Sequence, residues 1–372
     1  MGGRMPDSEI SIAVSASGAV SGRRDDGAEQ QSGQIALRGV DAELIRVFER
    51  WLTERDREWQ LADLRAFGSL LHRSLFPPDL WRWVEESIDA LPRGGRLRLQ
   101  LAFPADGMAH LAAIPWEYLY APDRAGREGF FLATDRRCML TRYIPMELGR
   151  PLKTATERAR VLVLVSQPDD PTLGEVVAEP VLADLQAAVS SGTPIELTVQ
   201  QQPTRDLLDK AAARLHPDVV HFMGHGRYDD HDEQGQIALV DETGRTDWVG
   251  ESALAQLLGD AGDMPRLVYL HSCSGAQTGY RASFAGLAPR LIRRGTHCVV
   301  AMQYAVTNRT AIAFSQGFYG GLTAGLPLDE SVQAGRRSLA VLHEKDPRLL
   351  GIPVVYLRAR DALLLPDSQA MG

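Results

Sequence analysis

From residue 160 onward, short apolar runs alternate with amphipathic segments, and this alternation constrains the fold more than any other feature. The run "RVLVLVSQ" at 160–167 is almost continuously apolar and ends before Pro168, which is typical of a strand buried on both faces of a sheet. Further strand-like runs lie at 195–200, 218–224, 265–272, 297–304 and 353–359. Helix-like segments lie between them, at 174–189, 203–215, 249–261, 284–295, 311–325 and 327–344. This order predicts an α/β fold with a mostly parallel sheet covered by helices on both faces.

The first 150 residues show a different pattern. Residues 1–36 are rich in Gly, Ser, Asp and Gln, which predicts a flexible leader, although residues 9–20 alternate enough to form a strand beside a partner strand. Residues 41–90 have helical spacing of apolar side chains, and "RLRLQLAF" at 96–103 alternates strictly, as a half-buried strand does. We therefore expect a leader at 1–36, a smaller N-terminal α+β subdomain at 37–150, the main α/β domain at 151–365 and a tail at 366–372.

Composition and charge exclude several classes of protein. The 372 residues carry a formal net charge of −8, whereas nucleic-acid-binding domains usually carry a basic patch. No apolar stretch approaches the ~18 residues that a membrane-spanning helix needs, and the N-terminus lacks the apolar core of a secretory signal. The three cysteines, Cys138, Cys273 and Cys298, are too few for a disulfide framework. We therefore expect a cytoplasmic protein that contacts neither nucleic acid nor membrane directly.

Two chemically reactive side chains follow predicted strands at the point where each strand ends. His225 ends "VVHFMGH" and Cys273 ends "LVYLHSC". The carboxyl ends of neighbouring parallel strands lie at one edge of the sheet, so the pair can meet there. A thiol becomes a good nucleophile when a nearby imidazole accepts its proton. The N–H groups of Gly226 and Cys273 are placed to hold the oxyanion of a tetrahedral intermediate. The pattern indicates nucleophilic catalysis by Cys273 with His225 as general base.

Four motifs in order resemble those of a known family. "IPWEYL" at 114–119, "HFMGHG" at 221–226, "LHSCSG" at 270–275 and the segment 299–325 are similar to the signatures of CHAT-domain proteins. These are caspase-like cysteine peptidases, in the same clan as caspases, metacaspases and separase. His225 precedes Cys273 by 48 positions, close to the ~50 residues typical of caspases. Residue 308 departs from the resemblance, since it is Asn where many members have Asp.

The resemblance implies a function as well as a fold. We expect a caspase-like cysteine endopeptidase that cleaves specific protein targets through a thioester acyl-enzyme. His225 and Cys273 form its catalytic dyad, and Gly226 and Cys273 form its oxyanion hole. Neither a cofactor nor a metal is expected. The resemblance also implies activation by a partner protein or sensor in a bacterial defence or cell-death module. The alternative is a catalytically silent caspase-like scaffold that binds partner proteins.

By resemblance to caspases, the pocket for the residue before the cleaved bond draws on three segments near the strand ends. None of the residues at these positions is an arginine, which disfavours an acidic residue before the cleaved bond. Two aspartates just beyond the first strand are able to accept a basic one, but we expect a neutral or apolar residue there. The candidate pocket residues are Ser166 or Gln167, Asp169, Asp170, His271, and Gln303 or Tyr304.

Overall fold

The computed structural model of the chain divides into two compact units. The larger comprises Met1–Gly3, Met146–Ser338 and Pro353–Gly372, and the smaller comprises Arg4–Pro145 and Leu339–Ile352. The structure describes residues 8–25, 27, 30–54, 57–103, 109–124, 126–144, 158–191, 193–229, 231–232, 234–260, 263–272, 287–304, 306–341 and 345–358.

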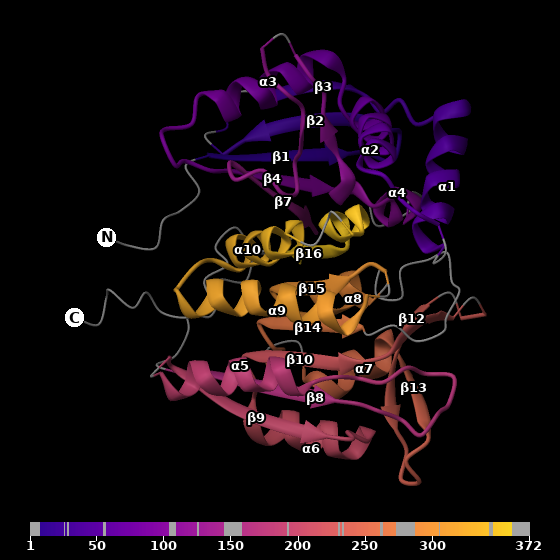
Figure 1. The fold of residues 1–372 in the computed structure, drawn as a ribbon, viewed down its shortest axis with the longest axis vertical. Helices are drawn as coiled ribbons and strands as arrows, with labels where there is room; N and C mark the ends of the chain where they lie inside the picture. Colours follow the sequence, from indigo (N-terminus) through magenta and orange to yellow (C-terminus); the bar gives the residue numbers. More distant parts are fainter. Residues whose placement is uncertain are drawn as a thin grey trace. The chain divides into compact units, whose positions relative to one another are not determined.

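The larger unit is built on a mostly parallel sheet (Figure 1). Its strands stand in the order β9-β8-β10-β14-β15-β16. Each pairs in parallel with its neighbour, except β16, which runs antiparallel to β15. The predicted fold class, an α/β fold with a mostly parallel sheet flanked by helices, is confirmed. The strands are β8 (Ala159–Val165), β9 (Ile195–Gln201), β10 (Val219–Gly224), β14 (Leu267–Ser272), β15 (Cys298–Met302) and β16 (Pro353–Leu357).

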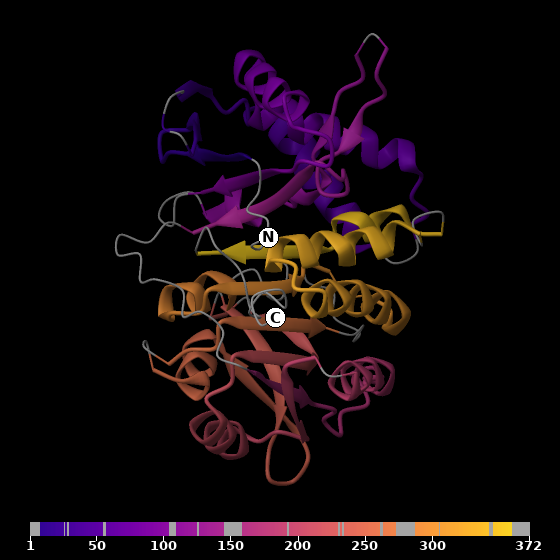
Figure 2. The same ribbon diagram turned by 90° about the vertical axis from the view of Figure 1, so that its left-hand side faces the viewer.

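Helices cover both faces of this sheet (Figure 2). Neighbouring α6, α7 and α8 pack in a row on one face, while α5 and α9 pack together on the other. Helix α10 fits closely against α9, because a Cβ on Gly321 would come within 2.9 Å of the Ser331 Cα atom. The helices are α5 (Glu179–Ser190), α6 (Arg205–Leu215), α7 (Glu251–Leu258), α8 (Leu287–Arg294), α9 (Asn308–Thr323) and α10 (Leu328–Ala340).

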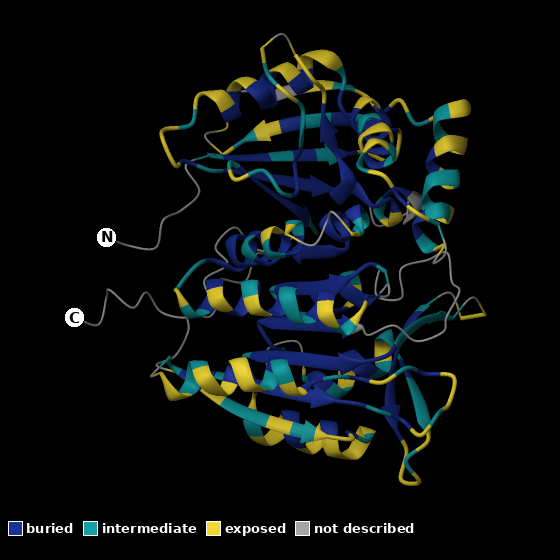
Figure 3. Cartoon of the chain, in the orientation of Figure 1, coloured by how far each residue is buried: buried dark blue, intermediate teal, exposed yellow. Residues whose placement is uncertain are grey.

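Local sequence explains where these elements begin and what they bury. The Thr204 side chain accepts a hydrogen bond from the Leu207 N–H (3.2 Å) and starts α6, and Thr307 caps α9 in the same way through Thr310. Such caps satisfy N–H groups that the first helical turn leaves without a partner. All residues of β10 are buried, as the continuous apolar run predicts, and Figure 3 shows the central strands dark blue beneath partly exposed helices.

A small antiparallel sheet adjoins the carboxyl end of β10. Strand β11 (Gly226–Asp229) pairs with β12 (Gln234–Val240), which pairs with β13 (Thr246–Gly250). The Arg205 guanidinium forms two hydrogen bonds with the Asp247 carboxylate, at 2.6 and 2.8 Å. These contacts anchor β13 to α6.

The strands of the smaller unit follow the order β3-β2-β1-β4-β7. Strands β1, β4 and β7 are parallel, and β2 and β3 add antiparallel strands at one side. The main elements are β1 (Ser8–Val14), β2 (Ala19–Arg24), β3 (Gln30–Gln34), β4 (Leu97–Ala102), β7 (Cys138–Tyr143), α1 (Val40–Thr53), α2 (Leu61–Leu75) and α3 (Pro78–Asp89). Shorter elements are α4 (Ala109–Ala113), a 3-10 turn at Trp116–Tyr118, the hairpin of β5 (Tyr120–Ala121) and β6 (Phe130–Phe131), and a second 3-10 turn at Pro347–Gly351.

The described part of residues 1–36 corrects the expectation of a flexible leader, because it forms strands β1 to β3. Ile10, Ile12 and Val14 are buried on one face of β1. β4, the strand predicted at 96–103, pairs with β1 in parallel. Composition predicted a leader because so few residues are apolar, but the alternating ones find a partner strand and bury their side chains.

The two units also differ from the expected division into 37–150 and 151–365. The expected boundary itself lies outside the described residues. The segment Leu339–Ile352 belongs to the smaller unit, where the Tyr118 hydroxyl donates to the Arg348 carbonyl at 2.7 Å. A chain segment far from the N-terminus in sequence therefore completes the smaller unit.

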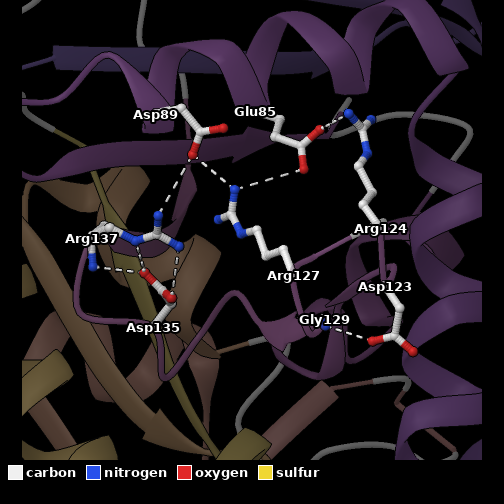
Figure 4. A network of polar contacts seen from close by, with 8 residues as sticks. All are labelled: Glu85, Asp89, Asp123, Arg124, Arg127, Gly129, Asp135 and Arg137. Atoms are coloured by element: carbon white, nitrogen blue, oxygen red, sulfur yellow. Dashed lines mark hydrogen bonds and ion pairs between the residues drawn. The ribbon is translucent and has the colours of Figure 1, made fainter.

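A surface network of charges joins α3 to the β5–β6 hairpin and the turn before β7 (Figure 4). Arg124 contacts Glu85 at 2.5 Å, and Arg127 contacts Asp89 at 2.8 Å and Glu85 at 3.9 Å. Arg137 lies 3.7 Å from the same Asp89 carboxylate. Arginines and carboxylates alternate through this network, so it holds the hairpin against α3.

The motif "IPWEYL" at 114–119 carries a buried ion pair. The Arg142 guanidinium donates to both oxygens of Glu117, at 2.9 and 2.6 Å, and also to the carbonyls of Ala112 and Ile114. Both charged side chains are almost completely buried. The Trp116 indole N–H donates to the Leu111 carbonyl at 2.8 Å. The motif is thus a packing element of the smaller unit.

We expect Glu117→Gln to lower the stability of the smaller unit by about 3–5 kcal/mol, because it leaves the buried Arg142 charge without its counter-charge. The measurement is the midpoint of urea denaturation. Asp79→Asn is the control, since it breaks the exposed Asp79–Arg82 pair and should cost about 1 kcal/mol or less. Equal losses of stability from the two variants would contradict a special contribution of the buried Glu117–Arg142 pair.

Candidate active site

The two predicted catalytic residues directly follow strands that are neighbours in the sheet. β10 and β14 pair in parallel, with Gly224 opposite Ser272. His225 is the next residue after Gly224, and Cys273 is the next after Ser272. Cys273 and the segment up to residue 286 lie outside the described residues. The described strands thus end side by side, one residue before each member of the predicted dyad.

His225 is held at the junction between the main sheet and the small sheet. His225 is only 1% exposed, and its carbonyl accepts a hydrogen bond from the Ala238 N–H of β12 at 2.9 Å. His225 and Ala238 are therefore a hydrogen-bonded pair of an antiparallel ladder, and Gly226 with Ile237 is the next, non-hydrogen-bonded pair. In such a pair the N–H groups point away from the partner strand, so the Gly226 N–H is turned away from β12.

A stack of rings lies between these strands and α9. The His221 and Tyr269 rings, opposite each other in β10 and β14, stack at 4.2 Å with planes 12° apart. The His271 ring lies 5.6 Å from His221 and nearly parallel to it. Tyr319 on α9 shares a 2.9 Å hydrogen bond with His221 Nδ1. The Tyr269 hydroxyl lies 2.9 Å from the Ser315 hydroxyl, also on α9. The stack attaches both β10 and β14 to one helix.

Burial keeps the two stacked histidines neutral. It lowers the pKa of His271 from 6.5 to about 4. It also lowers the pKa of His221 well below the usual value, with a smaller contribution from His271. Removing water from a positively charged imidazole is unfavourable when no carboxylate replaces it. Neither ring is therefore a carrier of positive charge at neutral pH.

The loop after β8 is fixed by two glutamines. The Gln202 side chain accepts the Gln167 N–H at 2.9 Å and donates to the Gln167 carbonyl at 2.7 Å, as a neighbouring strand would. The Gln167 side chain accepts the Val176 N–H at 2.6 Å and donates to the Gly174 carbonyl at 3.3 Å. Asn308, at the start of α9, donates to the Glu175 carbonyl at 3.3 Å. Gln167, a predicted pocket residue, thus shapes the loop that borders the site.

The two aspartates of this loop differ in their contacts. The Asp169 N–H donates to the Gly244 carbonyl at 2.8 Å. The Asp170 carboxylate accepts the Thr172 N–H and hydroxyl at 2.9 and 2.6 Å and the Thr246 hydroxyl at 3.1 Å. The Thr172 donors lower the pKa of Asp170 most, and the charge of His225 lowers it further. Asp170 is thus an ionised carboxylate whose field reaches the predicted catalytic imidazole.

The remaining predicted pocket residues are mostly covered. Ser166 and His271 are buried, Gln303 is 6% exposed, and Tyr304 is partly exposed. The Ser166 N–H donates to the Met223 carbonyl at 2.9 Å, which extends the pairing of β8 with β10. The structure therefore brings the ends of β8, β10 and β14 to one edge, where Asp170 and Tyr304 retain accessible surface.

Sequence analysis did not single out Gln202, Thr246 or Tyr319. Gln202 has a left-handed backbone (φ 47°). No residue pattern predicts that its side-chain amide will bond the main chain of Gln167 as a neighbouring strand would. Thr246 lies 76 residues from the aspartate it contacts. Tyr319 is readable only as one member of the buried face of α9. These roles depend on contacts between distant segments.

Other features of the described residues bear on alternative sites. The Cys138 and Cys298 side chains are buried, as the sequence predicts for small apolar side chains. No group of three or more His, Cys, Asp or Glu residues is arranged to hold a metal ion within the described part of the chain. No helix in that part has the length and apolarity needed to cross a membrane.

Comparison with known families decides the classification. Residues 65–359 match the CHAT domain family. The chain belongs to this family. The match covers most of the chain and confirms the resemblance carried by the four motifs. No curated protein matches the sequence.

Solved structures show the same fold in distant proteins. A gingipain R structure, titled an Arg-specific cysteine proteinase, has a TM-score of 0.50 at 12% identity, covering 87% of this chain and 76% of that one. A complex of the Porphyromonas gingivalis RgpB pro- and mature domains has a TM-score of 0.50 at 11% identity, covering 87% and 77%. The Saccharomyces cerevisiae separase–securin complex has a TM-score of 0.49 at 11% identity and covers 94% of this chain. The CHAT protein spans 30% of that separase chain.

The buried histidines predict a pH dependence of stability. Their folded pKa values lie below the unfolded value of about 6.5, so the unfolded chain binds more protons. Stability is fully present above pH ~6.5 and falls as pH decreases toward the folded pKa. From pH 6.5 to 5 one such histidine costs about 2 kcal/mol.

We expect His221→Asn to flatten this decline in urea-denaturation midpoints measured between pH 7 and pH 5, since Asn keeps a polar group near Nδ1 but does not titrate. His231→Asn is the matched control, because His231 is exposed, and it should retain the wild-type slope. If both variants decline as the wild type does, the buried His221 is not a source of the pH dependence.

Proposed function

We propose that this CHAT protein is a cysteine endopeptidase that cleaves specific protein targets through a Cys273–His225 dyad. The observation that carries the proposal is the register of β10 with β14. With Gly224 opposite Ser272, the residues that follow leave neighbouring strands at the same edge of the sheet. Adjacent strands are about 4.8 Å apart, a separation that suits proton transfer between a thiol and an imidazole.

The chemistry proceeds in two stages. His225 accepts the Cys273 thiol proton, and the thiolate attacks the carbonyl carbon of the scissile peptide bond. The N–H groups of Gly226 and Cys273 stabilise the oxyanion; the direction of the Gly226 N–H, away from β12, supports its part. His225 then protonates the leaving amine, and a thioester links the acyl group to Cys273. Water, deprotonated by His225, hydrolyses the thioester and restores the thiol.

The substrate pocket is proposed to lie at the edge formed by the ends of β8, β14 and β15. Gln167 shapes its border from within the loop, and Tyr304 and the two aspartates of that loop present accessible surface. His271 and Gln303 support the pocket from beneath, since both are buried. No metal or cofactor takes part in the proposed chemistry.

The proposed setting is a regulated one in the cytoplasm. Support comes from the CHAT family resemblance, which implies a bacterial defence or cell-death module in which a partner activates the peptidase. In the separase structures the matching chain is in complex with securin, a protein partner of that enzyme. By analogy, a protein activator or sensor is proposed for this chain.

The first test is the appearance of new protein N-termini in a cell extract treated with purified protein. Wild type should generate them and Cys273→Ala should not, while His225→Ala should lower the rate by about a thousandfold or more. The retained fold of each variant is checked by its denaturation midpoint. Cleavage that persists in Cys273→Ala would contradict the proposal.

Alkylation of the thiol separates a peptidase from a silent scaffold. The rate at which iodoacetamide modifies Cys273 should reach half its maximum at a pH well below the free-thiol pKa of ~8.5. In His225→Ala the pH of half-maximal rate should return to about that value. Cys138 and Cys298 are buried and should react slowly, so they serve as internal controls. A wild-type alkylation rate that is half-maximal near the free-thiol pKa, and that His225→Ala leaves unchanged, would favour the scaffold.

A further inference from the structure

Strand β9 has an open main-chain edge among the described residues. It is the last strand in the order of the larger unit and, in the described part of the chain, pairs only with β8 (Figure 1). Natural proteins usually protect such an edge with lysine, proline or a bulge, because unpaired main-chain groups bind other strands. β9 contains no Lys, Arg or Pro, its seven residues pair with β8 in unbroken register, and Val199 is 39% exposed. The edge is therefore able to accept a further strand.

The hydrogen bonds at the two ends of β9 show which main-chain groups face the open side. The Pro194 carbonyl accepts a hydrogen bond from the first residue of β8, and the Gln202 N–H donates to the carbonyl of its last residue, each at 2.8 Å. Even-numbered residues thus bond β8, and the main-chain groups of alternate residues in a strand point to opposite sides. The N–H and C=O groups of Leu197 and Val199 therefore point away from β8.

The side chains of β9 also divide into two sets. Glu196 and Thr198 line a pocket together with Leu215 at the end of α6. Alternate side chains of a strand point to opposite faces of the sheet, so Leu197 and Val199 lie on the other face, which α5 covers. The central apolar side chains of the edge therefore share one face, and the central polar side chains share the other.

The sequence of β9 is complementary to itself in the antiparallel direction. When Thr198 is placed opposite Thr198 of a second copy, Leu197 lies opposite Val199, and Glu196 lies opposite Gln200. Apolar pairs and Thr–Thr pairs stabilise neighbouring strands, whereas like charges directly opposite each other destabilise them. The same register sets the outward main-chain groups of Leu197 against those of Val199, as an antiparallel ladder requires. One register therefore satisfies both the side chains and the main chain.

Neighbouring registers meet these conditions less well. A register that places Val199 opposite itself sets the apolar Leu197 against the polar Gln201. A register that places Leu197 opposite itself sets Gln200 and Gln201 against residues that precede the strand. The register centred on Thr198 pairs the strand along its whole length, so it is favoured over both.

We propose that this protein forms a two-fold symmetric dimer through β9, with Thr198 on the symmetry axis. A two-fold interface must be self-complementary, because each residue contacts its counterpart's partner in both directions. A second copy of the chain is favoured over an unrelated strand, because it supplies the complementary side chain at each position. Antiparallel pairing reverses the strands, so the two candidate active sites lie at opposite sides of the shared sheet. The dimer does not depend on the proposed peptidase activity.

The first test measures the dissociation constant of the dimer by analytical ultracentrifugation. Gln200→Lys places a positive charge opposite Glu196 and should lower Kd by about 3- to 10-fold, whereas Gln200→Glu places like charges opposite each other and should raise Kd by a similar factor. Gln201→Lys and Gln201→Glu are the controls, because Gln201 lies opposite the apolar Ile195 in this register, and their Kd values should not differ in this way. A wild-type protein that stays monomeric, or equal effects of the two Gln200 substitutions, would overturn the proposal.

Cysteine cross-linking tests the symmetry axis directly. In a Cys273→Ala background, Thr198→Cys places two thiols in a non-hydrogen-bonded pair, where opposite side chains are closest, so mild oxidation should link the protein into covalent dimers. Val199→Cys is the matched control, because the two copies of this residue are offset along the strands, beyond the ~7 Å between Cα atoms that a disulfide spans, and it should lose the cross-link. Cys138 and Cys298 are buried and should not contribute. Equal cross-linking of both variants, or of neither, would contradict the proposed axis.

Discussion

The parallel pairing of β10 with β14 is the constraint on which the rest of the site depends. Main-chain hydrogen bonds along both strands set Gly224 opposite Ser272, and a shift of one residue would turn every side chain of one strand to the other face. The residues that directly precede His225 and Cys273 are thus aligned by the backbone before any side chain contributes. A strand buried on both faces suits this task, because its register is specified by packing on each side.

Helix α9 stabilises that alignment from one face. It contacts β10 through Tyr319 and His221, and it contacts β14 through Ser315 and Tyr269. Its first residue, Asn308, contacts the loop after β8. One helix therefore contacts β10, β14 and the loop after β8, three of the segments that contribute to the candidate site. The rings that make these contacts are neutral and buried, so they position the strands without adding charge beside the proposed catalytic pair.

Charged side chains are paired differently in the two units. In the smaller unit the buried Glu117–Arg142 pair and the network of Figure 4 match positive with negative groups, and they serve packing. At the strand ends of the larger unit, Asp170 is held firmly with no arginine paired to it among the described residues.

Much of this protein was readable from its sequence. The alternation of apolar runs with amphipathic segments determined the α/β class, because strands buried on both faces cannot be polar. His225 and Cys273 were identified as residues at strand ends, and the four motifs identified the family. The prediction from sequence was wrong at residues 8–34, where the composition suggested a flexible leader. Their strand structure depends on pairing with β4, about ninety residues away.

Only the tertiary structure decided which polar residues have which role. The Gln202 side chain bonds the main chain of Gln167 because the chain turns back beside that residue. Thr246 donates to Asp170, which lies 76 residues away in the sequence. The segment Leu339–Ile352 joins the smaller unit although it follows the larger one in sequence. Hydrophobic periodicity records which face of an element is buried, and that is local information. Hydrogen bonds and charges between distant segments leave no periodic pattern, so they are determined only when the chain has folded.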